Sequence, residues 1–120
     1  RFILDVFNPR LDMLARDPKQ KSLEHLFTEE GTGIVQELMT TINYNDATQV
    51  SHITCFRTRT HPDGTMKRDI QELRMRMIFP DELLLLLEHC GFKVLHRWGS
   101  YERDDFGPGM GKQLIVAKLA

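Results

Sequence analysis

The sequence has few cysteines, no long apolar run and no excess of charge of one sign. Cys55 and Cys90 are the only cysteines among 120 residues, so no disulfide framework is predicted and a reducing compartment is favoured. No apolar run approaches the roughly 20 residues that a membrane-spanning helix needs. The formal net charge is -1, which gives no strong field toward nucleic acid or an anionic membrane. We therefore expect a cytoplasmic protein with neither of those partners.

Motifs for metal binding are also missing. The five histidines show no H-x-x-x-H spacing, and the cysteines form no C-x-x-C pair, so no metal site is predicted. His52 lies on a predicted strand face that could line a cavity, which makes it a weak candidate for a general base. A satisfied or solvent-exposed histidine is the plainer interpretation of the same residue, and it is favoured.

The glycines at 107–111 spell "GPGMG", a pattern found in nucleotide-binding loops. Such loops lie between a strand and the N-terminus of a helix, which supplies amide donors to phosphate. Here a predicted strand, Lys112–Leu119, follows the glycines instead. The pattern therefore indicates a mobile loop and no phosphate site.

The opening residues "RFILDVFNP" predict a short buried strand that ends at Asn8-Pro9, because proline lacks the amide hydrogen. One or two helical turns and a short amphipathic segment are expected before residue 34. The period then changes to two, with turn signals at 43–46 and in "HPDG" at 61–64. Three alternating strands between residues 34 and 78 predict an antiparallel meander.

Pro80 is suited to the first turn of a helix, and Gly91 is a natural stop after it. The sequence "PDELLLLLEHC" between them predicts a leucine-rich helix that packs against more than one surface. A strand is expected at Phe92–Trp98 and a final one at Lys112–Leu119.

Two groups of side chains could bind a ligand. The third strand of the meander carries Arg74 and Arg76, whose guanidinium groups match carboxylate or phosphate. A solvated face paired with Asp69 and Glu72 is the favoured alternative for these arginines. Tyr101 follows Trp98 and could stack on a ligand, or it could anchor the loop.

The order of elements is more specific than any one motif. The tail "MRMIFPDELLLLLEHCGFKVLHRWGSYERDDF…KQLIVAKL" resembles the C-terminal end of class I S-adenosylmethionine-dependent methyltransferases. Phe79–Leu83, Gly91-Phe92, Gly99–Tyr101 and Leu114–Ala117 occupy the family's positions in order. The opening strand resembles the family's fifth strand, and the meander resembles the antiparallel insertion of small-molecule methyltransferases.

This resemblance implies an α/β fragment of Rossmann-like type, α+β in appearance, formed by one partial domain. Residues 1–33 would hold a sheet strand and a helical connection, 34–78 an antiparallel cap insertion, and 79–120 the C-terminal helix and two strands. The last strand, Lys112–Leu119, would lie antiparallel between Phe2–Val6 and Lys93–Trp98.

The implied activity is transfer of a methyl group from S-adenosylmethionine to a small-molecule amine or hydroxyl. The N-terminal cofactor-binding half would precede Arg1, so no residue here is assigned to the cofactor and the chain alone should be inactive. Phe7 and Asn8 would lie at the carboxyl end of the opening strand, where ligands bind in open α/β sheets. His52, Arg74, Arg76 and Tyr101 would approach the same pocket from the cap.

The exposed edge of the opening strand should pair with the missing half or with a second copy, which would give an oligomer. Two other classes stay open. One is a self-contained α+β module that encloses a small ligand, and the other is a dimerisation domain without catalysis. A ligand-binding module needs one continuous sheet wrapped around the leucine-rich helix, whereas a methyltransferase end needs the opening and closing strands side by side and the meander apart.

Overall fold

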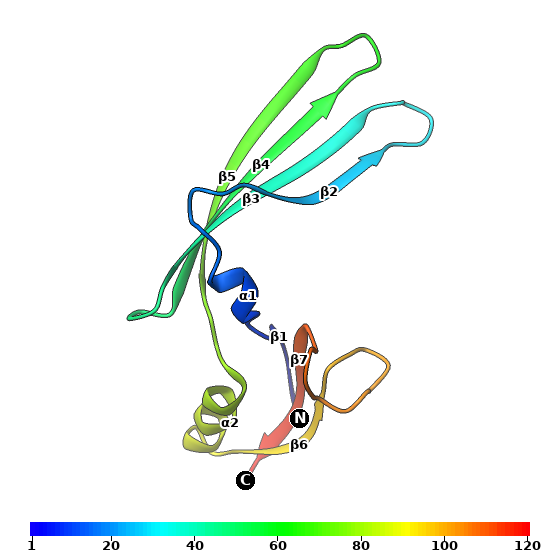
Figure 1. Cartoon of the computed structure of the whole chain (residues 1–120). Coiled ribbons are helices and arrows are strands. Elements are labelled where there is room, and N and C mark those ends of the chain that lie inside the picture. The colour runs from blue at the N-terminus through cyan, green and yellow to red at the C-terminus, as the bar shows by residue number, and fades with distance from the viewer. The chain divides into compact units, whose positions relative to one another are not determined.

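The computed structural model describes residues 1–120, which form two compact units (Figure 1). The helix-bearing unit consists of Arg1–Arg10 and Met77–Ala120. The meander unit consists of Leu11–Arg76. The polypeptide therefore passes from one unit to the other twice, once after residue 10 and once after residue 76.

The helix-bearing unit has a three-stranded sheet with the order β1-β7-β6. Its strands are β1 (Phe2–Phe7), β6 (Phe92–Trp98) and β7 (Lys112–Leu119), and both pairings are antiparallel. The closing strand thus lies between the opening strand and β6, which is the order that the resemblance implies. The predicted ranges of these strands are confirmed to within one residue.

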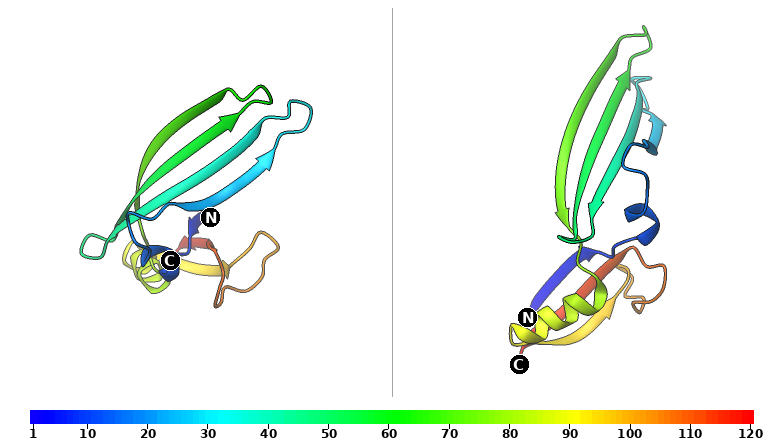
Figure 2. Two further views of the ribbon diagram at one scale, coloured as in Figure 1. Left: turned by 45° about the horizontal axis from the view of Figure 1, so that its top comes forward. Right: turned by 60° about the vertical axis from the view of Figure 1, so that its left-hand side comes forward.

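Helix α2 (Pro80–His89) lies across one face of this sheet (Figure 2). It begins at a proline with Asp81 and Glu82 in the first turn, where carboxylates favour the positive helix end, and Gly91 follows it with φ 85°. Leu83 and Leu87 pack with Ile115 and Ala117 of β7 in a buried cluster. The alternation along β7 places these small and branched side chains toward the helix.

Two expectations about burial are wrong. Leu85 and Leu86 are 65% and 46% exposed, so two of the five leucines of α2 are not buried as the expected packing on more than one surface requires. The opening strand is also not a buried strand, because Ile3 and Phe7 are 68% and 69% exposed on the sheet face that α2 does not cover. In both segments the apolar residues follow one another without alternation. Such a run does not reveal whether one face of the element is buried or two.

The meander unit has a four-stranded antiparallel sheet with the order β2-β3-β4-β5. Its elements are α1 (Leu11–Leu14), β2 (Ser22–Thr28), β3 (Val35–Asn45), β4 (Val50–Thr60) and β5 (Met66–Arg76). The turn between β4 and β5 is closed by a 2.9 Å hydrogen bond from Gly64 N–H to the His61 carbonyl, with Gly64 at φ 90°. The predicted meander of three long strands is confirmed.

The expected helical turn after the opening strand is present as α1, whereas the short amphipathic segment expected after it is the strand β2. Ser22–Thr28 pairs with β3, and the register shifts between Leu23 and His25. This bulge breaks the alternation of apolar residues, which is why the segment did not look like a strand. The compact meander unit, Leu11–Arg76, thus includes β2 beside the three long strands.

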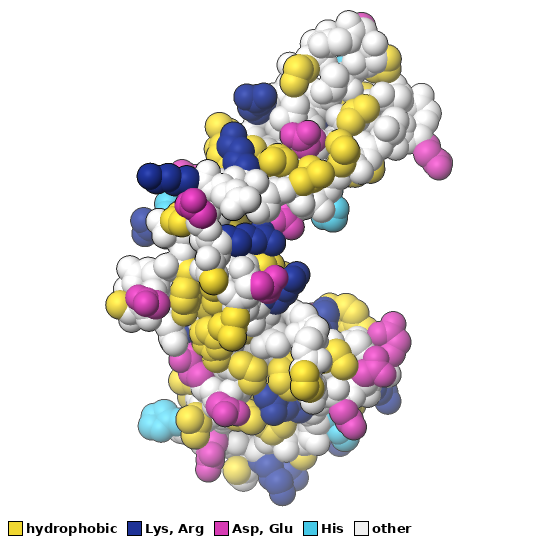
Figure 3. Space-filling view, in the orientation of Figure 1, with side chains coloured by type: hydrophobic (Ala, Val, Ile, Leu, Met, Phe, Trp, Pro, Cys, Tyr) yellow, Lys and Arg dark blue, Asp and Glu magenta, His cyan; other side chains and the backbone are white.

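Both faces of the four-stranded sheet carry apolar side chains among charged ones. The face that bears His52 also bears Met39, Phe56 and Ile70, whereas the opposite face bears Ile42 and Ile53. The only helix of the unit, α1, spans four residues, and hydrophobic side chains reach the surface beside Lys and Arg in Figure 3. Neither helix of the structure meets the length and hydropathy that crossing a bilayer requires.

Candidate functional site

The carboxyl end of β1 is fixed by two amide side chains. Asn8 donates its backbone N–H to the Gly111 carbonyl at 3.2 Å and its side-chain Nδ2 to the Met110 carbonyl at 2.8 Å. Gln113 is fully buried, and its Nε2 donates to the carbonyls of Phe7 at 3.2 Å and Ile78 at 3.0 Å. The predicted site residue Asn8 is therefore bound to the glycine loop and held in place.

A polar cluster of Asp5, Tyr101 and Lys112 lies on the sheet face opposite α2. Tyr101 donates its hydroxyl to Asp5 Oδ2 at 2.5 Å, and Lys112 Nζ lies 3.5 Å from the same oxygen. The ammonium group also lies 3.6 Å from the centroid of the Tyr101 ring. This arrangement orients a half-open carboxylate between a phenol and a cation.

The same contacts perturb both ionisable groups. The hydrogen bond from Tyr101, with the charge of Lys112, lowers the pKa of Asp5. Contact with Tyr101 and the negative charge of Asp5 raise the pKa of Lys112. Both groups are therefore charged at neutral pH.

Phe7 joins this open face. It is two residues from Asp5 on the same strand, its register partner on β7 is Lys112, and its side chain is 69% exposed. The structure thus brings two predicted site residues, Phe7 and Tyr101, to one face of one sheet, with Lys112 connecting them. An exposed aromatic side chain beside a charged pair can hold a small polar ligand with an apolar part.

The glycine loop does not have the form of a nucleotide-binding loop. It runs directly into β7 and no helix follows it. A Cβ atom at the buried Gly99 would lie 2.6 Å from Met110 Cγ, so the loop already packs closely on the end of β6. These residues therefore do not fit S-adenosylmethionine, and we assign the cofactor no residue of this chain.

In the meander unit, His52 and Arg74 lie next to each other. His52 on β4 is the register partner of Arg74 on β5 and of Asn43 on β3, and its imidazole is 42% exposed. Its Nε2 lies 3.9 Å from Glu72 Oε2, which is an ion pair only when the histidine is protonated. Arg76 follows Arg74 on the same face, whereas Asp69 lies on the other face opposite Arg57.

The predicted site residues consequently fall into two groups. Phe7, Asn8 and Tyr101 belong to the helix-bearing unit. His52, Arg74 and Arg76 belong to the meander unit. A pocket that uses both groups stays a prediction.

The sequence analysis did not identify several polar residues that form hydrogen bonds or ion pairs in the structure. A charged residue in the middle of the apolar strand "FILDVF" was the available signal for Asp5, and a polar pair before "LIVA" was the signal for Lys112 and Gln113. No cluster of His, Cys, Asp or Glu in the structure has the grouping that a metal ion requires.

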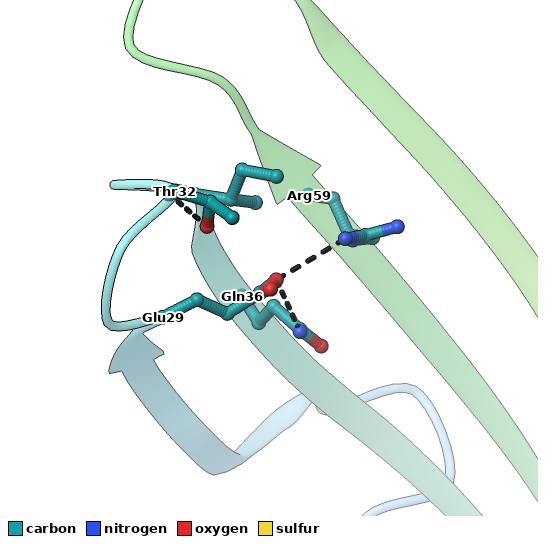
Figure 4. A network of polar contacts seen from close by, with 5 residues as sticks. Glu29, Thr32, Gln36 and Arg59 are labelled. Carbon is teal, nitrogen blue, oxygen red and sulfur yellow. Dashed lines mark hydrogen bonds and ion pairs between the residues drawn. The ribbon is translucent and has the colours of Figure 1, made fainter.

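Another missed group is centred on Glu29, which follows β2 (Figure 4). Its carboxylate accepts hydrogen bonds from Gln36 Nε2 at 2.6 Å and from an Arg59 guanidinium nitrogen at 3.1 Å. These donors, Gln36 first, lower the pKa of Glu29. The network ties the β2–β3 turn to β4 through Gln36 and one guanidinium nitrogen of Arg59.

Comparison with known proteins identifies the fold of the chain. No protein-family model and no curated protein matches the chain. Among solved structures, the CcbJ methyltransferase from Streptomyces caelestis matches 99% of this chain and 43% of its own, with 17% identity and a TM-score of 0.66.

Two further solved structures are of the same class. An S-adenosylmethionine-dependent methyltransferase from Clostridium acetobutylicum matches 99% of this chain and 44% of its own, with 14% identity and a TM-score of 0.63. The sugar N-methyltransferase KedS8 from a Streptoalloteichus species matches 95% and 41%, with 14% identity and a TM-score of 0.53. The chain therefore has a methyltransferase-like fold, and it spans about two fifths of the length of these structures.

Proposed function

We propose that this chain is the C-terminal portion of an S-adenosylmethionine-dependent methyltransferase that methylates an amine or hydroxyl of a small molecule. The observation that carries the proposal is the match of nearly the whole chain, both units included, to part of three methyltransferase structures. The order β1-β7-β6 supports it further, because the family resemblance implies that order.

The sheet topology also counts against a self-contained ligand-binding module. Such a module needs one continuous sheet around the leucine-rich helix. The chain instead has two separate sheets, and the buried leucines of α2 pack on the three-stranded one. The methyltransferase proposal accounts for both sheets, the first as the edge of the catalytic domain and the second as a cap.

In this proposal the chain binds and orients the methyl acceptor. Phe7 and Tyr101 offer exposed aromatic surface at the carboxyl end of β1, and Asn8 fixes that end. Arg74 and Arg76 hold an anionic or polar substituent of the acceptor. His52, whose Nε2 lies 3.9 Å from Glu72 Oε2, takes the proton that an ammonium or hydroxyl acceptor loses.

In this proposal the supply of the methyl group lies with residues outside this chain, and the form of the glycine loop, which is followed by a strand, supports this. Rate acceleration then comes mainly from holding the acceptor atom in line with the methyl group. The 120-residue chain alone is inactive in this account.

The test uses the full-length product of the gene that encodes this chain. We expect it to form S-adenosylhomocysteine with at least one member of a panel of amino sugars, simple amines and hydroxyl compounds. Arg74→Ala should raise the KM for that acceptor by roughly tenfold. Arg57→Ala, on the opposite sheet face, is the matched control and should leave KM unchanged.

Two results would overturn the proposal. One is a full-length protein that neither binds S-adenosylmethionine nor consumes it with any acceptor. The other is equal behaviour of the Arg74 and Arg57 variants, which would remove the acceptor-binding role from the His52-bearing face of the sheet. A lower kcat for His52→Gln with a shifted pH profile would support the role of the base.

A further inference from the structure

Strand β5 is an edge strand whose residues are almost all exposed to solvent. It forms one edge of the four-stranded sheet, its partner on the inner side is β4, and ten of its 11 residues are exposed. Its sequence, "MKRDIQELRMR", contains no proline or glycine. One side of its backbone therefore presents N–H and C=O groups over the full strand, a template for another strand.

The other edge of this sheet is less suitable for pairing. Strand β2 has seven residues, and the register shift between Leu23 and His25 interrupts its ladder. Bulges and short strands are devices that blunt a sheet edge, whereas β5 has neither. Like charges that face each other across two paired strands would also prevent pairing. The order of the charged residues along β5 therefore decides whether this edge can pair.

The charges of β5 match each other in one antiparallel register. We propose that β5 pairs with β5 of a second copy of this chain about a two-fold axis at Ile70, which joins two four-stranded sheets. In that register Ile70 faces Ile70 of the second copy, and Arg68 faces Glu72 at both symmetry-related positions. Asp69 faces Gln71, and Lys67 faces Leu73, so no like charges face each other.

Neighbouring registers lack this match. Moving the axis to Gln71 places Arg68 opposite Arg74 twice, and moving it to Asp69 or Glu72 places identical carboxylates opposite each other. Like charges directly across a strand pair are destabilising, and opposite charges are favourable. If one β5 strand instead slipped by a single residue along the other, equivalent side chains of the two copies would lie on opposite faces of the joined sheet.

Apolar surface supports the same axis. Along the row that contains Ile70, the register partners are Phe56 on β4, Met39 on β3 and Leu23 on β2. Ile70 and Leu23 are 62% and 54% exposed in the single chain. Pairing at Ile70 joins this row to its copy, so that one apolar stripe crosses the whole combined sheet, with charged pairs on both sides of the axis. Hydrophobic burial and main-chain hydrogen bonds then act together.

The experiment measures the mass of the 120-residue chain by sedimentation equilibrium, with charge reversal as the specific probe. We expect a species of twice 14.0 kDa for the wild-type chain. Arg68→Glu and Glu72→Arg should each give monomer, because each places two pairs of like charges across the axis. The double variant Arg68→Glu/Glu72→Arg should restore the dimer, and circular dichroism should show all variants folded.

A cross-linking measurement checks the register independently. In a chain with Cys55→Ser and Cys90→Ser, Ile70→Cys should be joined to its copy by a short thiol-specific cross-linker. Leu23→Cys, at the other sheet edge, is the matched control and should not be joined. The proposal is overturned by a monomeric wild-type chain, by a dimer that tolerates either single reversal, or by failure of the double variant to restore it. Because methyl transfer is not measured, these results are independent of the proposed function.

Discussion

Gln113 is a buried polar side chain whose two hydrogen bonds reach different parts of the chain. Its amide donates to the carbonyls of Phe7 and Ile78, which lie three residues before Arg10 and one residue after Met77. These are the places where the chain leaves and re-enters the helix-bearing unit. A single side chain therefore anchors both connections to the meander unit.

Replacing Gln113 by leucine should lower the free energy of unfolding by about 2–4 kcal/mol, because two carbonyl groups lose their donor inside the protein. Urea unfolding followed by circular dichroism measures this loss. Gln20→Leu, at an exposed loop position, is the matched control and should change stability by less than about 0.5 kcal/mol. Equal stability of both variants would show that the Gln113 amide contributes nothing.

The lowered pKa of Asp5 predicts a dependence of stability on pH. A carboxylate whose pKa is lower in the folded state contributes stability above its ordinary value of 3.8 and loses that contribution as pH falls through the lower folded value. The unfolding free energy of the wild-type chain should therefore fall on acidification through this range, and Asp5→Asn should lack this part of the fall.

The measurement is a series of urea midpoints between about pH 2 and pH 6. Asp46→Asn, in an exposed turn, is the control, and it should keep the wild-type dependence on pH. If Asp5→Asn shows the same acid profile as the wild type, the contact with Tyr101 does not stabilise the carboxylate in solution.

At the scale of elements, α2 shows how one leucine-rich segment separates into a buried and an exposed face. Leu87 is 7% exposed and packs in the core cluster, whereas Leu85 is 65% exposed. Leu87→Ala should cost about 2–4 kcal/mol of unfolding free energy, and Leu85→Ala, as its control, less than about 1 kcal/mol. Thermal unfolding of the two variants checks this, and equal losses would contradict the observed packing face.

The elements that the sequence predicts well are those with strong local signals. Pro80 and Gly91 enclose α2, and the "HPDG" turn fixes the connection between two long alternating strands. Strand β2 could not be predicted in the same way, because its bulge at Leu23 and His25 breaks the period. The sequence also could not predict which leucines of α2 are buried. Five adjacent leucines point in all directions around the helix, and only the packed structure shows which face is covered.

The candidate site, like the fold, has one part that the sequence predicts and another that it does not. Phe7 and Tyr101 were predicted, and the structure places them on one sheet face. Their connection through Asp5 and Lys112 was not predicted, because Asp5 and Tyr101 are 96 positions apart in sequence. Contacts at such separations depend on strand order, which the family resemblance implied but no local pattern revealed.

At the scale of the whole molecule, the chain has two sheets and therefore two sets of edges. In the methyltransferase account, β1 is an inner strand of a larger sheet, and its free edge pairs with residues outside this chain. The β5 edge belongs to the other unit, and its charge pattern specifies a second copy of itself. The Arg68 and Glu72 variants distinguish these edges, because neither residue lies in the helix-bearing unit.

The most direct test of the central claim is calorimetric titration of S-adenosylmethionine into two samples: the 120-residue chain and the full-length product of its gene. The account predicts binding by the full-length protein and none by the chain alone, because the glycine loop runs into a strand and packs on the end of β6. Absence of binding by the full-length protein would contradict the proposed methyltransferase function. Binding by the chain alone would show that the cofactor site was placed wrongly.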